Sequence, residues 1–438
     1  MIKVCKFGGT SMSDGINLRR VADIIESDPE RKYIVVSAPG KRYSGDEKVT
    51  DLLYEAQKNL EETGALGEPF QKVCARFCGI VAELGLQMDV GGLLRETEQE
   101  IVKENSADFT ASRGEYLAGM VTARLLGVPF IDARDIVRFD EDGMLDSERT
   151  FRLTADALNE RPRAVIAGFY GASPEGRIKT FSRGGSDISG AIVARASGAD
   201  LYENWSDVSG FLAADPRIVP DPERIHALSY KELRELSYMG ANVLHAEAIF
   251  PVAEADIPVL IKNTFRPEDD GTYILPATSN QLGARTVTGI AGSRHFSVIY
   301  LEKSLMNAEI GFAYRVLSVL SAHGVSFEHI PSGIDTMSVV IDSKELGDGV
   351  LETLEREIKA AVRPDTIRIL SGVALIAVVG HGMSKAAGTP ARLFRAIGNV
   401  SVNVRMIDQG SSGLNIIVGV DNCDYERTLR AIYEEFFL

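Results

Sequence analysis

The stretch IKVCKFGGTSMSDGINLRRVADIIESDPERKYIVVS, residues 2–37, holds the strand, helix and second strand from which the fold of the first two-thirds of the chain is inferred. Ile2–Phe7 and Tyr33–Ser37 are short apolar runs rich in β-branched residues, as in buried strands. Between them, Asp14–Ser27 has the apolar spacing of an amphipathic helix. This order predicts two parallel strands joined by a helix that covers one face of a sheet.

The same alternation continues along the chain. Further helix-like and strand-like segments are Thr110–Leu126, Val128–Asp132, Ala164–Phe169, Asp187–Ser197, Asp200–Trp205 and Pro258–Lys262. We therefore expect an α/β fold with a mainly parallel sheet sandwiched by helices. In such sheets ligands bind at the carboxyl ends of the strands, and the glycine pairs Gly8-Gly9 and Gly184-Gly185 fall in this region.

The pattern changes after Arg266–Gly292, a segment rich in Gly, Pro, Asn and Thr. Beyond it, five residues recur 77 positions later without a gap: Gly311, Arg315, Val325, Ile330 and Gly333 return as Gly388, Arg392, Val402, Ile407 and Gly410. Each copy has the order strand, helix, strand, strand, helix, so we interpret the tail as a duplicated α+β unit. We predict three domains, at residues 1–285, 286–370 and 371–438.

The composition narrows the class of function. The chain has 438 residues, of which 45% are hydrophobic, and a net charge of −15. An acidic chain repels the phosphate backbone, so we expect no nucleic-acid partner. No apolar run approaches the ~20 residues of a membrane helix, and the first residues enter a strand instead of a signal peptide. We expect a cytoplasmic protein with reduced, mostly buried cysteines, namely Cys5, Cys74, Cys78 and Cys423.

The first candidate for chemistry is KFGGTS, at Lys6–Ser11. A lysine at the end of a buried strand would direct its ammonium at the ligand-binding edge of the sheet. Gly8 and Gly9 would let backbone N–H groups approach a phosphate with no Cβ in the way. The same residues would equally suit a plain strand-to-helix turn with a surface lysine.

The second candidate is GFYGASPEGRIKTFSRGGSD, at Gly168–Asp187, which opens a helix. Arg183 offers a guanidinium fork for a carboxylate. The N–H groups of residues 184–186 lie at a helix N-terminus, where anions bind well. Asp187 could cap this helix, or it could position Lys6 or a ligand ammonium. Both interpretations of Asp187 stay open.

Two further motifs are weaker by themselves. SRGE at Ser112–Glu115 lies on a helix that is otherwise apolar on one face, where a carboxylate is ordinarily exposed to solvent. WSDVSGFLAADPR at Trp205–Arg217 has the composition of a surface turn. The GxxxxGK[ST] phosphate loop and the GxGxxG fingerprint are both missing, so ATP would need another binding device.

Taken together, these motifs are far more specific. The chain resembles the aspartate kinases of the amino-acid kinase superfamily in the order of its motifs. These motifs are KFGGTS, VVSA, SRGE, GRIKTFSRGGSD, SDVSGFLAADPR and GANVLH. The duplicated tail is similar to the paired ACT regulatory units of these kinases. The resemblance covers essentially the whole chain. It implies ATP-dependent phosphorylation of the side-chain carboxylate of L-aspartate to 4-phospho-L-aspartate, the first step of lysine, threonine and methionine biosynthesis.

The resemblance also implies roles for single residues. Lys6 and Asp187 would be catalytic, with Lys6 neutralising charge on the transferring phosphoryl group. The residues implied to hold L-aspartate are Thr50, Glu115, Arg183 and Ser186. Of these, Arg183 would take the α-carboxylate and Glu115 would lie near the α-amino group. The residues implied to bind the nucleotide are Lys6, Gly8, Gly9, Ser206, Asp207, Asp215 and Arg217.

The implied chemistry needs no general base. The side-chain carboxylate of aspartate has a pKa of ~3.9 and is ionised at neutral pH. In-line positioning and positive charge around the γ-phosphoryl group would suffice. We expect Mg²⁺ to be held mainly by phosphate oxygens and water, so we predict no dedicated metal-ligand residues.

Three positions depart from the usual pattern of relatives. Asn242 stands where many have Lys, Ser206 where they often have Thr, and Leu212 where they often have Tyr. Ser206 keeps a hydroxyl group. Asn242 removes a charge near the expected nucleotide site, so one contact with ATP must differ or be lost.

The first ACT unit resembles an amino-acid effector site. Its candidate residues are Met306, Gly311, Phe312, Ala313, Ser326 and Glu328. Each of them would otherwise be a core or turn residue. We expect lysine, alone or with threonine, to inhibit by shifting the population between two forms. We also expect a homodimer or a dimer of dimers, because ACT units generally pair across a subunit interface.

Two alternatives stay open on the sequence alone. Related kinases that act on glutamate, acetylglutamate, carbamate or nucleoside monophosphates share the fold, but they usually lack SRGE together with two ACT units. A catalytically silent amino-acid-binding regulator is supported only by Asn242. Lys6, Arg183 and Asp187 stand against it.

Overall fold

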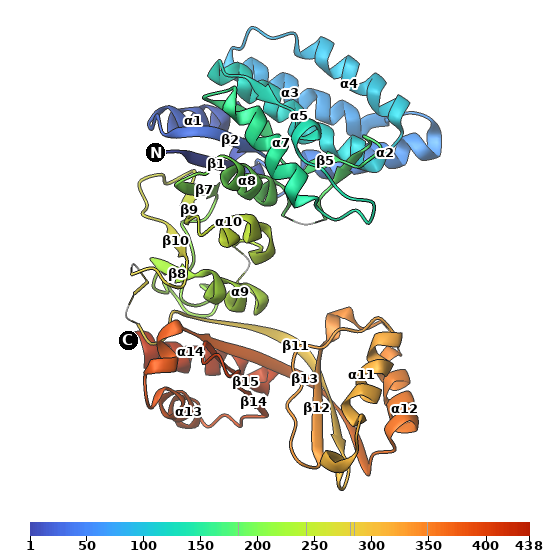
Figure 1. Cartoon of the computed structure of the whole chain (residues 1–438), viewed down its shortest axis with the longest axis vertical. Coiled ribbons are helices and arrows are strands. Elements are labelled where there is room, and N and C mark those ends of the chain that lie inside the picture. Colours follow the sequence, from blue (N-terminus) through green and yellow to red (C-terminus); the bar gives the residue numbers. More distant parts are fainter. Residues whose placement is uncertain (183, 242, 281, 284, 348) are drawn as a thin grey trace. The chain divides into compact units, whose positions relative to one another are not determined.

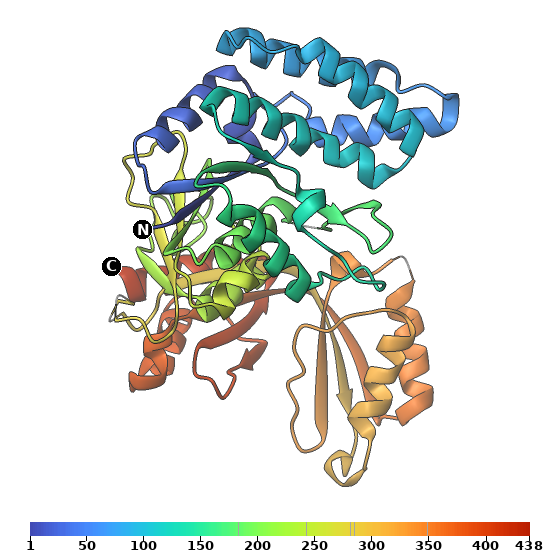
Figure 2. The same cartoon turned by 45° about the horizontal axis from the view of Figure 1, so that its top comes forward.

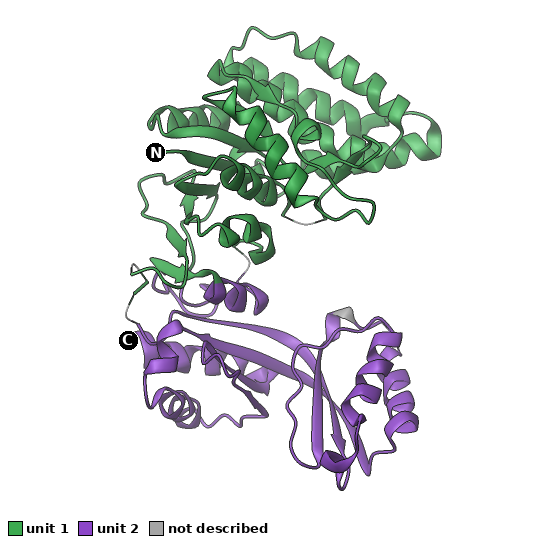
Figure 3. Cartoon of the chain, in the orientation of Figure 1, with its two compact units in different colours: residues 1–211, 226–230, 242–283 green, residues 212–225, 231–241, 284–438 purple. Residues whose placement is uncertain are grey.

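The computed structural model describes residues 1–182, 184–241, 243–280, 282–283, 285–347 and 349–438. The chain forms two compact units (Figure 3). Unit 1 comprises residues 1–211, 226–230 and 242–283, and unit 2 comprises residues 212–225, 231–241 and 284–438. Each unit has its own sheet and its own helices.

In its described residues, unit 1 is built on an eight-stranded sheet (Figure 1). In order across the sheet, the strands are β3 (Phe130–Ile131), β4 (Ala164–Ala167), β2 (Arg31–Val36), β1 (Lys3–Phe7), β7 (Leu201–Ser206), β9 (Val259–Asn263), β10 (Thr272–Leu275) and β8 (Ala227–Ser229). Neighbouring strands run parallel, apart from β9 and β10, which pair antiparallel. The predicted α/β fold with a mainly parallel sheet is confirmed, and β1 lies in its middle.

Helices pack on the sheet and on one another. In unit 1 they are α1 (Gly15–Glu26), α2 (Val49–Thr63), α3 (Gly67–Leu84), α4 (Val90–Glu104), α5 (Ala107–Leu126), α6 (Ala133–Ile136), α7 (Ser147–Asn159), α8 (Gly185–Ala196) and α10 (Phe250–Glu254). α8 packs on β1, β2 and β7, and α5 packs on β2 and β4. Figures 1 and 2 show α2 to α5 side by side as long helices. A hairpin of β5 (Tyr170–Ala172) and β6 (Ile178–Thr180) lies before α8.

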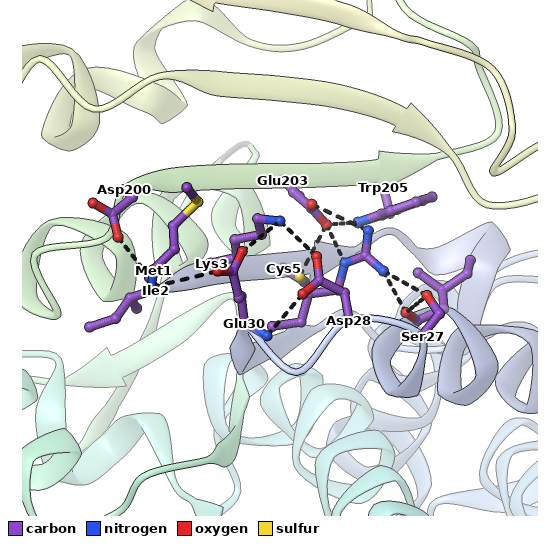
Figure 4. Close-up of polar contacts among 12 residues, drawn as sticks. Met1, Ile2, Lys3, Cys5, Ser27, Asp28, Glu30, Asp200, Glu203 and Trp205 are labelled. Atoms are coloured by element: carbon purple, nitrogen blue, oxygen red, sulfur yellow. Dashed lines mark hydrogen bonds and ion pairs between the residues drawn. The ribbon is translucent and has the colours of Figure 1, made fainter.

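A buried polar network joins the central strands on the face opposite α8. Glu203 of β7 accepts hydrogen bonds at Oε2 from Arg31 Nε at 2.8 Å, from Trp205 Nε1 at 2.8 Å and from the Cys5 thiol at 3.4 Å. Figure 4 shows Cys5, Glu203 and Trp205 meeting there, with the pair of Lys3 and Asp28 beside them. Burial raises the pKa of the Cys5 thiol well above its usual range. The network therefore ties β1, β2 and β7 together through one carboxylate.

The other cysteines are less buried than we expected. All four are free thiols, but Cys74 is half-buried and Cys78 and Cys423 are exposed. Cys78 follows the buried Phe77 on α3, and helical periodicity turns it to the outer face of that helix. Among the residues that the structure describes, no helix combines the length and the apolar character that crossing a membrane requires.

The described part of unit 2 is built on a five-stranded antiparallel sheet. Across it, the strands are β12 (Thr336–Asp342), β11 (Gly289–Glu302), β13 (Thr366–Val379), β15 (Asn415–Asp421) and β14 (Met406–Asp408). α9 (Tyr230–Tyr238) belongs to this unit apart from its first residue. The helices of the repeat are α11 (Phe312–Ala322), α12 (Val350–Val362), α13 (Thr389–Asn399) and α14 (Tyr425–Phe437). The two copies of the repeat therefore have matching helices. The position of β14 is taken in the first copy by a segment that touches β12 through the bridges His329↔Val340 and Ser332↔Met337.

The two copies share the long strands β11 and β13. These strands pair along almost their whole length, and both bend at the same place. There β11 shifts register between Ser293 and Phe296, and Gly372 of β13 has a left-handed φ of 78°. The predicted border at residue 370 thus falls inside β13. Residues 212–225 and 231–241 belong to unit 2, although we predicted them in the first domain. The domain borders as such stay predictions.

We expect Glu203→Gln to lower the free energy of unfolding of unit 1 by about 3 kcal/mol. The change removes the partner of Arg31, whose side chain is only 12% exposed, and a buried charge that loses its partner is costly. Denaturant unfolding measures the difference. Glu30→Gln is the control, because Glu30 pairs with Lys3 at a 39% exposed position and should cost less than about 1 kcal/mol. Equal losses in the two variants would contradict the structural importance of the network.

Candidate active site

An ion pair between Lys6 and Asp187 lies at the centre of the site. Lys6 is near the carboxyl end of β1, and Asp187 is in the first turn of α8. Lys6 Nζ lies 2.6 Å from Asp187 Oδ1, and the two side chains are only 9% and 15% exposed. Gly184 occupies the N-cap position of α8 and supplies no side-chain hydrogen bond. Asp187 therefore pairs with Lys6 and does not cap the helix.

Gly8 and Gly9 directly follow β1 and approach neighbouring backbone closely. The Gly8 N–H donates to the Trp205 carbonyl at 3.0 Å, and the Gly40 N–H donates to the Gly9 carbonyl at 2.8 Å. A Cβ on Gly40 would lie 2.6 Å from the carbonyl carbon of Gly9. Only glycine permits this approach. The backbone after β1 is therefore held on one side by β7 and on the other by the loop that follows β2.

The loop between β2 and α2 is held by Asp46. This carboxylate accepts hydrogen bonds from Arg42 Nε at 2.8 Å and from Arg76 Nη2 at 2.8 Å. The hydrogen bond from Arg42 lowers the pKa of Asp46 well below its usual range. Arg76 also donates to the Gly40 carbonyl at 2.9 Å, so α3 fixes the glycine that packs on Gly9. Thr50, a predicted aspartate-binding residue, is half-buried in the first turn of α2 just after this loop.

The end of β4 packs under the first turn of α8. A Cβ on Gly168 would lie 2.9 Å from Ser186 Oγ, so only glycine leaves room for this predicted aspartate-binding residue. Phe169 follows with a left-handed φ of 78°, an uncommon conformation outside glycine. Its N–H donates to Ser189 Oγ at 3.0 Å, and that hydroxyl donates to the Gly185 carbonyl at 2.9 Å. Arg183 lies outside the described residues, so its contact with an α-carboxylate stays a prediction.

Glu115 is a buried carboxyl group with unused hydrogen-bonding capacity. It lies on α5 and is 4% exposed, which is the opposite of the solvent-exposed position typical of such a residue. Within the described part of the chain, its Oε2 has no hydrogen-bond partner. Burial raises its pKa to about 8, against the lowering effects of the Ala38 N–H and of the Lys6 charge. A cation that approached this group would favour its ionised form and pair with it.

Ser206 and Asp207 lie beside the glycine pair at the end of β7. Ser206 is the last residue of the strand and is half-buried. Asp207 Oδ2 accepts a hydrogen bond from Thr10 Oγ1 at 3.4 Å. The structure therefore brings seven of the predicted residues to one edge of the sheet in unit 1: Lys6, Gly8, Gly9, Ser186, Asp187, Ser206 and Asp207. Glu115 joins them through its contact with Ala38 and the charge of Lys6.

Asp215 and Arg217 belong to unit 2 and pair with each other. Arg217 Nη2 lies 2.6 Å from Asp215 Oδ2, and this partner holds the pKa of Asp215 below its usual value. Leu212 lies in the same unit and is 37% exposed. The structure does not place these residues with Lys6, so their contact with a nucleotide stays a prediction. Asn242 is outside the described residues.

The effector candidates in unit 2 fall into two groups. Met306 and Phe312 are 8% and 4% exposed, and both belong to the hydrophobic core under α11 and α12. Their side chains are therefore core residues, and only their backbone groups remain for a ligand. Gly311 has a left-handed φ of 78° just before α11. Ala313 and Ser326 are exposed, and Glu328 is half-buried with its N–H bonded to the Val340 carbonyl at 2.8 Å.

Sequence reasoning missed Tyr202 and Asn204 of β7. Tyr202 OH donates to the main-chain carbonyl of Asp187 at 3.1 Å, and Asn204 Nδ2 donates to Asp187 Oδ1 at 2.7 Å. A signal was present, because Glu203 and Asn204 are consecutive polar residues in an apolar strand. Their burial shows that each needs a specific partner.

Comparisons with known proteins agree with this arrangement. Residues 1–263 match the amino acid kinase family, and residues 376–436 match an ACT domain. The chain is 38% identical to aspartokinase 3 of Bacillus subtilis over 450 aligned positions, which cover 100% of this chain and 99% of that protein. The chain belongs to the aspartate kinases. The fold, the family resemblance and the enzyme class predicted from the sequence are thereby confirmed.

Solved structures of aspartate kinases match over the whole length of the chain. The aspartate kinase of Clostridium acetobutylicum is 47% identical, with a TM-score of 0.93 and coverage of 99% of both chains. Aspartokinase III of Escherichia coli, solved in complex with aspartate and ADP, is 27% identical, with a TM-score of 0.78 and full coverage of both chains. The same enzyme has also been solved in complex with lysine and aspartate.

The raised pKa of Glu115 predicts how the stability of this aspartate kinase depends on pH. The folded protein keeps the Glu115 proton up to about pH 8, whereas the unfolded chain releases it near pH 4.5. The stabilisation is therefore complete below pH 4.5 and is lost as the pH rises towards 8. In the absence of ligands, wild type should lose about 1.4 kcal/mol per pH unit relative to Glu115→Gln across this window.

Denaturant unfolding of both proteins between pH 5 and 8 measures this difference. Glutamine resembles the neutral carboxyl group and does not titrate, and the other ionisable groups are common to both proteins. A difference that stays constant across the window would contradict a raised pKa at Glu115. Glu83→Gln, at an exposed residue whose carboxylate accepts the Gly15 N–H at 2.7 Å, is a control for the general effect of removing a charge.

Proposed function

We propose that this aspartate kinase transfers the γ-phosphoryl group of ATP to the side-chain carboxylate of L-aspartate at the edge of the sheet around Lys6. The observation that carries the proposal is the buried Oε2 of Glu115, which has no hydrogen-bond partner among the described residues and belongs to a carboxyl group that interacts with the charge of Lys6. A buried carboxyl group is costly to leave unsatisfied, and the α-ammonium group of an amino acid is a matching partner. The enzyme from Escherichia coli was solved with aspartate and ADP, which supports the assignment.

The roles that we propose combine the positions in unit 1 with the roles that the family resemblance implies. Glu115 binds the α-ammonium group of aspartate, Arg183 binds its α-carboxylate, and Thr50 and Ser186 complete the pocket. Lys6 neutralises charge on the transferring phosphoryl group. The N–H groups of Gly8 and Gly9 cradle the phosphates. Further nucleotide contacts are proposed for Ser206, Asp207, Asp215 and Arg217.

In the proposed reaction, an oxygen of the substrate carboxylate attacks the γ-phosphorus. The new bond joins that oxygen to phosphorus, and the bond between phosphorus and the oxygen bridging to the β-phosphate breaks, so ADP leaves. No proton has to be removed, because the carboxylate is already ionised. The protein therefore contributes positioning and positive charge. When bound, Mg²⁺ would neutralise phosphate charge, held mainly by phosphate oxygens and water, with Asp187 and Asp207 as nearby carboxylates.

Trapping the acyl phosphate with hydroxylamine tests this reaction directly. We expect ATP- and aspartate-dependent hydroxamate formation by wild type and a loss of at least about 100-fold in Lys6→Ala, because the alanine leaves transition-state charge without its cation. Lys3→Ala is the matched control. Lys3 lies on the same strand but pairs with Asp28 away from the site, so this variant should keep its rate within about twofold.

Other outcomes of the hydroxylamine assay would point to a different function. Hydroxamate formed with a different carboxylate, but not with aspartate, would identify a sibling kinase. No signal with any carboxylate would support a silent amino-acid-binding regulator. Full activity in Lys6→Ala would contradict the role of the ion pair.

We further propose feedback inhibition by lysine, alone or with threonine, at the first ACT unit. The complex of the Escherichia coli enzyme with lysine and aspartate supports lysine as the effector. The proposed effector contacts are the backbone near Met306, Gly311 and Phe312 together with Ala313, Ser326 and Glu328. The same proposal includes assembly as a homodimer or a dimer of dimers and a cytoplasmic location. It also places the reaction at the first step of lysine, threonine and methionine biosynthesis.

Titration with lysine should lower the initial rate of wild type, and Glu328→Gln should raise the half-inhibitory concentration about 10-fold or more. The reason is that a carboxylate paired with a ligand ammonium makes a charge-assisted hydrogen bond that the amide lacks. Glu352→Gln, at an exposed position on α12, should leave inhibition unchanged. An enzyme indifferent to both lysine and threonine would contradict the proposed regulation.

A further inference from the structure

Strand β7 presents two buried side chains to the first turn of α8. Tyr202 and Asn204 are two residues apart, so they point to the same face of the sheet, and they are 0% and 4% exposed. Tyr202 OH bonds to the main-chain carbonyl of Asp187, and Asn204 bonds to its side chain. One strand therefore holds Asp187 at two points.

Asn204 and Lys6 converge on the same atom. They are paired in register on the adjacent parallel strands β7 and β1. Lys6 Nζ lies 2.6 Å from Asp187 Oδ1, and Asn204 Nδ2 lies 2.7 Å from it. This oxygen thus accepts one charged donor and one neutral donor. The two donors differ in how far they can move, because the lysine has a long flexible side chain and the asparagine has a short one on a central strand.

The distance between β7 and α8 suits the length of an asparagine. A Cβ on Gly190 of α8 would lie 2.4 Å from Tyr202 OH, so glycine lets the helix approach the strand closely. A shorter side chain at position 204 would fall short of Asp187, and a longer one would not fit between the two elements. A second carboxylate there would compete with Asp187 for Lys6.

We propose that Asn204 is a positioning residue for phosphoryl transfer. Its side-chain amide holds the Asp187 carboxylate in place and keeps donating a hydrogen bond to it while the Lys6 ammonium turns towards the phosphoryl group. This inference rests on the proposed role of Lys6. Without Asn204, Lys6 would leave a buried carboxylate with no donor from β7, and a buried charge without a partner is strongly disfavoured. Lys6 would then stay with Asp187, and the loss would appear in kcat.

The kinetics of Asn204→Leu and Asn204→Asp test the proposal. Leucine has a similar volume but no donor, and aspartate has the same shape but accepts instead of donating. In the hydroxamate assay we expect kcat to fall about 10-fold or more in Asn204→Leu, with the KM for aspartate changed less than about twofold. Asn204→Asp should lose more, because its carboxylate binds Lys6. If Asn204→Leu does not fold, Asn204→Ala, which also lacks the donor, takes its place in the comparison.

Glu203→Gln is the matched control. Glu203 is the preceding residue of the same strand, is 3% exposed, and faces the opposite side of the sheet. This variant should be less stable than wild type, but its kcat per folded molecule should stay within about twofold. It therefore separates damage to β7 from damage to the ion pair.

Two results would overturn the proposal. One is that the Asn204 variants lose thermal stability as Glu203→Gln does but keep a normal kcat, which would make Asn204 purely structural. The other is a raised KM for aspartate with an unchanged kcat, which would place Asp187 in substrate binding and not with Lys6. A wild type that phosphorylates no carboxylate would overturn the proposed function as well, and that result is seen before any Asn204 variant is compared.

Discussion

The pairing of Lys6 with Asp187 is the interaction on which the site depends. It joins a strand in the middle of the sheet to the helix that covers one face of that sheet. A lysine can be this deeply buried only with a fixed anionic partner. Because β1 is paired on both edges, the backbone of its lysine cannot shift without disturbing β2 and β7. The pair therefore sets the position of the glycine turn after β1 and of the first turn of α8.

The two faces of the central strands have different roles, one structural and one in the site. On one face, Cys5, Arg31, Glu203 and Trp205 form a closed set of hydrogen bonds and an ion pair. On the other face, Lys6 and Asn204 meet Asp187. Glu115 of α5, which contacts Ala38 after β2, has an Oε2 with no hydrogen-bond partner in the described part of the chain. The satisfied network fixes the strands. Glu115 leaves a carboxyl oxygen for a ligand, and its burial costs stability that a carboxyl group in a polar setting would not lose.

Unit 2 shows how a sequence repeat and a structural unit can differ. The two copies are spaced evenly along the chain, but β11 and β13 run through both of them. Each copy therefore completes its part of the sheet with backbone from the other. Residues 212–225 and 231–241 also join this unit, as in the hydrogen bond from the Ile290 N–H to the Ala213 carbonyl at 2.7 Å. A boundary drawn from composition alone could not anticipate this exchange, because strand pairing is a long-range property.

The sequence by itself determined the order of strands and helices, the parallel sheet, the duplicated tail and the identity of the family. These depend on local periodicity and on motifs with fixed spacing, which a chain carries before it folds. It also named Lys6, Asp187 and Glu115. Only the tertiary structure decided that Asp187 pairs with Lys6, that Glu115 is buried with a raised pKa, and that Asn204 shares the Asp187 oxygen. Burial and partnership arise when strands distant in sequence become neighbours, so no local pattern could specify them.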